Sequence, residues 1–518
     1  MGRTKISSVL AVIALSVMLS GCNRPEPRTH VSFNEGWKFA LAAGDDARQP
    51  AYDDSGWRTV DLPHDWSIEG EFSESHPASP GGGALPGGIG WYRKTFRVSN
   101  ADKEKMTYIT FDGVYRNSEV WINGNHLGKR PYGYSSFRYD LTPFLKYGDE
   151  ENVIAVKADN SAQPNSRWYS GSGIYRNVWL TTTEKIAVDH WGTFVTTPVV
   201  TTEEALLMVT TQVKNSSGSK TDVRMETVVY DADNRKVASA ETGQVEIIIA
   251  GTTVTQELTV KNPRLWSLEN PHLYRVVTTI RSGQMVADRY ETVTGIRSFE
   301  FDAEKGFVLN GEPIIIKGVC NHHDLGCLGA AVNTRAIERQ LEILREMGCN
   351  GIRTSHNPPA PELLDLCDRM GFIVMDEAFD IWKVKKTDYD YSLDFDEWHL
   401  KDLEAMVLRD RNHPSVFIWS IGNEVMEQWE RDGSGEAIAI ELADFVRSMD
   451  DTRPVTAACN DPAPHNPVIA SGALDLIGFN YRDTLWTRFP QTFTGGKFIG
   501  TETTSALATR GSYDMPSD

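Results

Sequence analysis

Two short strings near the end of the chain each place a carboxylate after an apolar run. Ile421-Gly422-Asn423-Glu424 ends in one glutamate, and the run 498–502 ends in a second, Glu502. Two carboxylates held close together are the catalytic groups that hydrolysis of a glycosidic bond usually requires. We therefore predict that Glu424 and Glu502 act as a catalytic pair.

The segment from about residue 300 to 518 alternates predicted strands with predicted helices. Asn333 is placed to cap a helix whose apolar face carries Ile337, Leu341 and Leu344. Strand–helix repetition of this kind is typical of a (β/α)8 TIM barrel. The predicted strands are Pro313–Val319, Ile352–Thr354, Phe372–Asp376, Val416–Ile421, Pro454–Ala458, Leu474–Phe479 and Lys497–Thr501.

Polar side chains follow these strands, and a parallel barrel brings all strand carboxyl ends to one face. Acids, imidazoles and amides together can donate to and accept from sugar hydroxyls. The residues expected there are Asn321, His322, His323, Asp324, Arg353, His356, Asn357, Asp376, Glu377, Asn423, Glu424, Asn480, Tyr481 and Glu502.

The part of the chain before the barrel reads as two all-β domains. Residues 33–182 contain short strands and the hairpin signal Asn123-Gly124, so we predict a jelly-roll-like β-sandwich. Residues 183–299 contain regularly spaced strands, which predict an immunoglobulin-like β-sandwich. The catalytic barrel is expected to occupy 300–518.

Composition narrows the classes of partner. The formal net charge of −19 disfavours nucleic acid and favours a neutral or cationic ligand. The 14 Trp residues favour a carbohydrate ligand, although most Trp side chains simply pack in a hydrophobic core. No metal-ligand spacing stands out, so we expect no required cofactor, and leave open a Mg or Na ion held by acidic residues.

The N-terminus reads as a targeting signal. Arg3 and Lys5 precede an apolar run, 9–19, that is too short to span a bilayer. The run ends in Leu-Ser-Gly before Cys22, which resembles a bacterial lipoprotein lipobox. We expect a signal peptide at 1–21, acylation of Cys22, a tether at 22–32, and a lipid-anchored location in the bacterial cell envelope.

Three longer strings resemble glycoside hydrolase family 2. Residues 350–358 are similar to its first signature, with Asn357 where Tyr is more usual, and 410–420 running into Asn423-Glu424 are similar to its second. Residues 166–176 resemble a segment of the family's β-galactosidase-like members. Two β-sandwiches followed by a barrel are also the family's layout.

The resemblance implies roles for the residues gathered at the barrel face. Glu424 would be the general acid/base, and Glu502 the nucleophile of a retaining mechanism. Asn423 would bond the sugar 2-hydroxyl, and Arg353 and Tyr481 would hold Glu502. Further sugar contacts are expected from His356, from His322 or His323, and from Asp159 and Arg167 of the first sandwich, whereas Asp376 and Glu377 are expected to be ion-pair partners of Arg353.

The expected substrate is a terminal β-D-galactoside of an oligosaccharide or glycan, with the oligomeric state left open. β-Glucuronidase or β-mannosidase activity in the same family is one alternative. A lipid-anchored carbohydrate-binding fragment without catalysis is another.

Only sixteen residues follow Glu502, whereas an eighth strand and its helix need roughly 40. The sequence therefore predicts an incomplete barrel that lacks strand 8. We expect a fragment of a longer enzyme that is unstable and weakly active.

Overall fold

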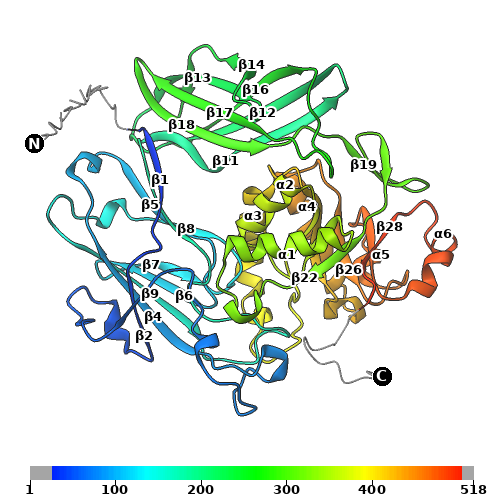
Figure 1. Cartoon of the computed structure of the whole chain (residues 1–518), viewed down its shortest axis with the longest axis horizontal. Coiled ribbons are helices and arrows are strands. Elements are labelled where there is room, and N and C mark those ends of the chain that lie inside the picture. Colours follow the sequence, from blue (N-terminus) through cyan, green and yellow to red (C-terminus); the bar gives the residue numbers. More distant parts are fainter. Residues whose placement is uncertain (1–25, 505–518) are drawn as a thin grey trace, which may run out of the picture.

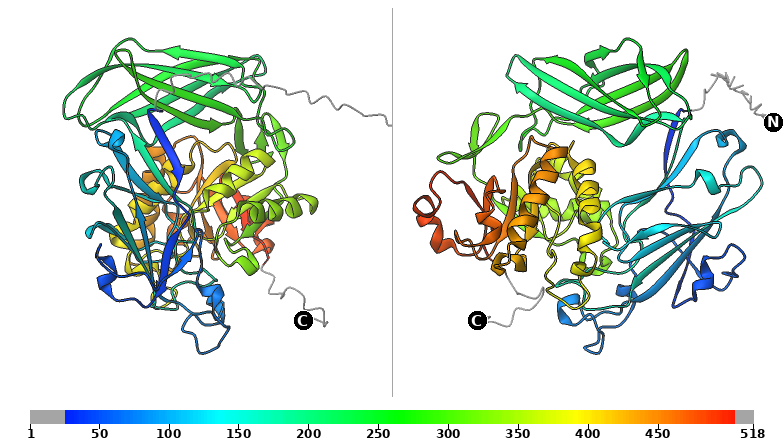
Figure 2. Two further views of the ribbon diagram at one scale, coloured as in Figure 1. Left: turned by 60° about the vertical axis from the view of Figure 1, so that its left-hand side comes forward. Right: turned by 180° about the vertical axis from the view of Figure 1, so that it is seen from behind.

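The computed structural model describes residues 26–504. The predicted leader at 1–21, Cys22 and the start of the predicted tether lie outside the described residues. The described chain forms three bodies: a β-sandwich, a smaller β-sandwich above it, and a parallel barrel beside both (Figures 1 and 2). No helix in the described range is both long and apolar enough to cross a membrane.

The first sandwich packs two antiparallel sheets around a core rich in aromatic residues, including Trp37, Phe39, Trp66, Tyr92 and Phe111. One sheet runs, in spatial order, β1 (Arg28–Ser32), β10 (Val178–Thr183), β5 (Met106–Phe111) and β8 (Phe137–Asp140). The other runs β3 (Arg58–Val60), β2 (Trp37–Leu41), β4 (Gly88–Phe96), β9 (Asn152–Asn160), β6 (Ser118–Ile122) and β7 (Asn125–Arg130).

The predicted hairpin at Asn123-Gly124 is confirmed. These two residues join β6 to β7 with φ angles of +51° and +82°. Positive φ at both central positions is the requirement of a type I′ turn, which Asn-Gly meets at low cost.

The second sandwich also consists of two antiparallel sheets. Its cores gather inward-facing aliphatic residues such as Leu207, Val209, Val276 and Ile280. One sheet contains β11 (Ile186–Val200), β12 (Glu204–Asn215) and β16 (Thr252–Lys261). The other contains β14 (Lys236–Glu241), β13 (Thr221–Tyr230), β17 (Tyr274–Ser282) and β18 (Met285–Thr294), with β15 (Val245–Ile247) paired to β13.

The barrel domain contributes seven parallel strands whose order in space follows their order in the chain. They are β22 (Gly318–Asn321), β23 (Gly351–Thr354), β24 (Ile373–Glu377), β25 (Val416–Asn423), β26 (Val455–Cys459), β27 (Leu476–Asn480) and β28 (Phe498–Glu502). The helices are α1 (Thr334–Glu346), α2 (Pro361–Met370), α3 (Phe395–Asp410), α4 (Ser434–Met449), α5 (Pro467–Ala470) and α6 (Phe489–Thr492).

The predicted fold class is confirmed, including seven barrel strands within the described residues. One strand was misplaced: residues 312–314 form β21 (Glu312–Ile314) of a small antiparallel sheet with β19 (Phe299–Asp302) and β20 (Gly306–Leu309). The first parallel strand begins only at Gly318, directly after Lys317, so the predicted strand Pro313–Val319 joins the end of one strand to the start of the next.

Asn333 caps α1 as predicted, since its side chain accepts a hydrogen bond from the Ala336 main-chain N–H. Ile337 and Leu341 of that helix are buried. The first sandwich is fastened to the barrel by the buried Arg176, whose guanidinium donates to the main-chain oxygens of Pro358 and Pro359. These contacts place the first sandwich over the carboxyl ends of the barrel strands.

Candidate active site

The two predicted carboxylates, Glu424 and Glu502, both accept hydrogen bonds from one side-chain amide. Asn480, at the end of β27, donates from its side-chain nitrogen to Glu424 Oε1 at 3.0 Å and to Glu502 Oε2 at 3.3 Å. The two carboxylate oxygens therefore lie no farther apart than the sum of these two bonds.

Arg353 on β23 organises the floor of the site. Its buried guanidinium donates to Glu502 Oε2 at 3.1 Å and to Asn423 Oδ1 at 2.7 Å. It also forms a two-pronged bond to Glu377, with its closest contact at 2.8 Å. Arg353 was predicted to lie near Glu502, and the structure places it there.

Glu377, at the end of β24, is fully buried and bonds both Arg353 and His356. His356 Nδ1 lies 2.7 Å from Glu377 Oε1, and the Ser420 hydroxyl donates to Oε2 at 2.7 Å. Burial alone would raise the pKa of Glu377, but the Arg353 charge and the His356 bond outweigh it and lower the pKa. Asp376 does not pair with Arg353; burial and the nearby Asp410 raise its pKa well above the usual range.

The backbone bends sharply where two side chains of the candidate site leave their strands. Glu424 has φ +45° and Tyr481 has φ +59°, both in the left-handed region that non-glycine residues rarely adopt. Such strain is concentrated at functional sites. The bend at Tyr481 lets its hydroxyl donate to Glu502 Oε1, which is the contact predicted for this tyrosine.

The first sandwich reaches the site through Arg167. Its guanidinium forms a two-pronged pair with Asp380, at 3.0 Å from Nε to Oδ2 and 2.6 Å from Nη2 to Oδ1. Asp380 also accepts from the Asn423 side-chain nitrogen at 2.8 Å. Arg167 was predicted to bind sugar, and the structure places it one side chain away from Asn423.

The two adjacent histidines point to different neighbours. The His322 ring lies 5.0 Å from the Trp168 ring and 5.4 Å from the His356 ring, and desolvation lowers the pKa of His322 to about 4. His323 instead packs against Tyr134 with its Nε2 3.3 Å from the Ser170 main-chain oxygen, and burial lowers its pKa to about 3. Of the two, His322 is the one that shares a cluster with His356.

Asp159 is not brought into this group. Its carboxylate accepts from the main-chain N–H and the hydroxyl of Ser161, two residues along the chain. Aspartate commonly bonds its own turn in this way, so the structure gives Asp159 a local role where we predicted a sugar contact.

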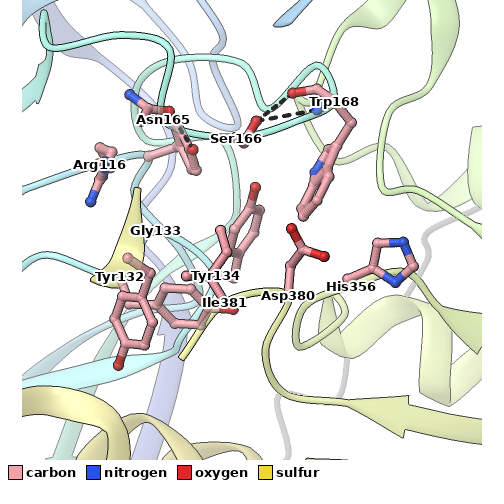
Figure 3. Close-up of a pocket in the computed structure, with 12 residues that line it drawn as sticks. Arg116, Tyr132, Gly133, Tyr134, Asn165, Ser166, Trp168, His356, Asp380 and Ile381 are labelled. Atoms are coloured by element: carbon pink, nitrogen blue, oxygen red, sulfur yellow. Dashed lines mark hydrogen bonds between the residues drawn. The ribbon is translucent and has the colours of Figure 1, made fainter. Parts of the chain in front are cut away.

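A pocket opens between the first sandwich and the barrel (Figure 3). It holds about 380 Å³ of empty space including its mouth. Figure 3 shows the Asp380 carboxylate directed towards Trp168, with His356 beside it and Tyr134 facing them. The remaining lining residues are Tyr115, Arg116, Tyr132, Gly133, Asn165, Ser166, Ile381 and Tyr391.

Asp380 and Lys386 were missed by the sequence analysis. Asp380 stands three residues after Glu377, so its place just beyond a strand end was a usable signal. Lys386 sits in a stretch with Lys383 and Lys385 that reads as a solvated loop, yet its Nζ is buried against Asp380 at 2.8 Å. Among residues 26–504 no three acidic, His or Cys side chains form a group suited to a metal ion.

Three consecutive segments match one protein family. Residues 31–184 match the sugar binding domain of glycosyl hydrolases family 2, 187–297 match a segment described as glycosyl hydrolases family 2, and 302–492 match that family's TIM barrel domain.

Individual relatives agree with this match. β-Galactosidase BoGH2A of Bacteroides ovatus is 55% identical over 95% of this chain and 61% of its own length. A solved glycosyl hydrolase family 2 member from Bacteroides cellulosilyticus superposes with a TM-score of 0.89 at 40% identity, covering 92% of this chain and 61% of that one. β-Glucuronidase 2 of Bacteroides uniformis, solved covalently bound to cyclophellitol-6-carboxylate aziridine, superposes with a TM-score of 0.78 at 27% identity over 91% and 59% of the two chains. The chain thus spans about three fifths of the length of these relatives.

Proposed function

The chain belongs to glycoside hydrolase family 2, and we propose that it is a retaining exo-glycosidase that hydrolyses terminal β-D-galactosides. The observation that carries the proposal is the single Asn480 nitrogen that bonds both Glu424 and Glu502. Retaining glycosidases hold their two carboxyl groups too close together for a water to fit between them, and one carboxylate attacks the sugar directly.

Glu502 is the nucleophile in this proposal. Its two oxygens are held from different sides, Oε1 by the Tyr481 hydroxyl and Oε2 by Arg353. These two donors hold the carboxylate in place for attack. The attacking oxygen bonds to the anomeric carbon as the glycosidic carbon–oxygen bond breaks, which gives a glycosyl ester on Glu502.

Glu424 completes both halves of the reaction. In the first half its carboxylic acid gives a proton to the departing glycosidic oxygen. In the second half its carboxylate takes a proton from a water that attacks the anomeric carbon and releases Glu502. Asn423 is expected to bond the 2-hydroxyl of the sugar, and its bonds to Arg353 and Asp380 support this role.

A neutral sugar is favoured over a uronic acid. Three cations lie near Asn423, and each is paired with a protein carboxylate: Arg353 and Lys386 bond Asn423 directly, and Arg167 bonds its partner Asp380. The name of BoGH2A, at 55% identity, points to the same substrate class. β-Glucuronidase activity remains the second candidate, because the relative from Bacteroides uniformis carries that name at 27% identity.

A panel of nitrophenyl glycosides tests the proposal. We expect the β-D-galactoside to be hydrolysed fastest, with the β configuration retained in the first product seen by NMR. Glu502→Gln should abolish turnover, whereas Glu404→Gln, at an exposed position on α3, should leave it unchanged. Fastest turnover of the glucuronide or mannoside would transfer the assignment to those activities, and equal sugar binding with no activity lost in Glu502→Gln would favour a binding module.

We also propose that acylation of Cys22 anchors the protein in the bacterial cell envelope. The basic residues and the apolar run that precede Cys22 support this proposal. Labelled palmitate should enter the parent chain and leave Cys22→Ser unlabelled and absent from the membrane fraction. Equal labelling of both would contradict it.

A further inference from the structure

Lys386 lies in the segment between β24 and α3, and its ammonium is buried behind the candidate acid/base. Its Nζ donates to Asp380 Oδ1 at 2.8 Å and to the main-chain oxygen of Asn423 at 2.8 Å. Asn423 is the residue immediately before Glu424. The lysine therefore holds the peptide from which Glu424 leaves its strand.

Asp380 is the second half of this arrangement. A single oxygen, Oδ1, accepts from Lys386, from Arg167 and from the Asn423 side-chain nitrogen. Burial alone would raise the pKa of Asp380, but the two cations outweigh it and keep the carboxylate ionised. An ionised carboxylate accepts only, so it dictates which end of the Asn423 amide faces it.

Asn423 is consequently held at several points, which include its main-chain N–H donating to Phe379 and its side-chain oxygen accepting from Asn480. Its main-chain oxygen binds Lys386, its side-chain nitrogen binds Asp380, and its side-chain oxygen accepts from Arg353 at 2.7 Å. The next residue, Glu424, takes up φ +45°. A strained bend persists only where the surrounding contacts over-determine it, and Lys386 and Asp380 supply those contacts on one side.

We propose that Lys386 and Asp380 are positioning residues that fix the Asn423 amide and the Glu424 backbone for glycoside hydrolysis, with Arg167 making this fixation dependent on the first sandwich. The inference rests on the proposed function. Lys386 and Asp380 are not members of the catalytic pair. Their role is to keep Asn423 in place to bond the 2-hydroxyl and Glu424 in place to donate a proton.

Lys386→Met tests the proposal against Lys385→Met, the adjacent residue, whose exposed ammonium pairs only with Asp388 among the described residues. We expect Lys386→Met to lower kcat by about 10- to 100-fold with little change in KM. The loss should shrink on a 2-deoxy galactoside, which lacks the group that Asn423 binds, and on a dinitrophenyl galactoside, which needs little proton donation. A loss of equal size on all three substrates, or none, would overturn the proposal. Asp380→Asn, of nearly unchanged shape, provides the same test should Lys386→Met fold poorly.

Crystal structures of Lys386→Met and Lys385→Met give a readout that does not depend on turnover. The proposal predicts a rotated Asn423 amide or a shifted Asn423 carbonyl in the first variant alone. An unmoved Asn423 would refute it even if activity fell. Should the parent chain hydrolyse no glycoside, the proposed function would fail, whereas the positioning of Asn423 would still be decided by these two structures.

Discussion

At the scale of single residues, the site depends on a few side chains that each serve several partners. Asn480 bonds both carboxylates, and Arg353 joins Glu377, Asn423 and Glu502. Shared partners make the geometry rigid, because no one group can move without breaking a bond to another. They also make the effects of substitutions non-additive.

Replacing Glu424 by Gln should remove proton donation and leave attack by Glu502 in place. We expect kcat/KM to fall about 10²- to 10⁴-fold for a galactoside with a poor leaving group. A dinitrophenyl galactoside should still form the glycosyl-enzyme quickly, because its leaving group needs no proton. Stopped-flow measurement of the first turnover separates the two steps, and equal losses on both substrates would argue against an acid/base role.

Replacing Arg353 by Lys keeps the positive charge but removes the planar guanidinium, which can bond several partners at once. A single ammonium cannot reach Glu377, Glu502 and Asn423 together, and each charge-assisted bond lost is worth about 1.5–3 kcal/mol. We expect kcat/KM to fall at least about tenfold, together with a lower Tm. Arg482→Lys serves as the control, since Arg482 is exposed and its Nε donates to the Asn460 main-chain oxygen. Parent-like kinetics in Arg353→Lys would show that the guanidinium is not needed.

At the scale of elements, an ion pair joins α2 to the turn before β25. His413 Nδ1 lies 2.6 Å from Asp368 Oδ2, and the Ser415 main-chain N–H donates to the other oxygen at 3.0 Å. Burial alone would lower the pKa of His413, but the Asp368 charge outweighs it and raises the pKa to about 9. The turn before β25, the strand that carries Asn423 and leads to Glu424, is therefore bonded to helix α2.

This raised pKa predicts a pH dependence of stability. The ordinary histidine pKa is about 6.5, so the folded state binds the proton more tightly than the unfolded state. The stabilisation is fully present below pH 6.5 and is lost as pH rises through about 9. We expect the free energy of unfolding of the parent to fall over this interval more steeply than that of His413→Gln. Parallel curves from urea titrations would contradict the assignment.

The sequence was informative about elements and about residues at strand ends. Glu424, Glu502, Arg353 and Tyr481 were found because a parallel barrel collects whatever follows its strands. The sugar contact of Asp159 stays a prediction, and Lys386 was overlooked because its position depends on how a loop folds back. No periodic pattern reveals that one lysine of three is buried beside an aspartate.

At the scale of the whole molecule, the first sandwich is part of the site as well as a neighbour of it. Arg176 is fully buried and donates to main-chain oxygens on both sides of the interface, at Tyr134 in the sandwich and at Pro358 and Pro359 in the barrel. The same sandwich supplies Arg167, which pairs with Asp380. Docking of the sandwich and the setting of the active site are therefore coupled.

Arg176→Met should weaken this docking. Each buried carbonyl left without a donor costs about 1–3 kcal/mol, so we expect a lower Tm and separate unfolding transitions in calorimetry. Activity should fall with it, since Arg167 would lose its fixed place. Arg97→Met, at an exposed pair with Glu151, is the control. One sharp transition at the parent temperature would show that Arg176 does not couple the domains.

The proposed reaction depends above all on the attack of Glu502 on the sugar. Incubation with a 2-deoxy-2-fluoro-β-D-galactosyl fluoride, followed by mass spectrometry of the intact chain and its peptides, tests it most directly. We predict one added fluorogalactosyl group per chain, mapped to Glu502 and absent from Glu502→Gln. A label on another residue, or turnover of galactosides in Glu502→Gln, would contradict the account.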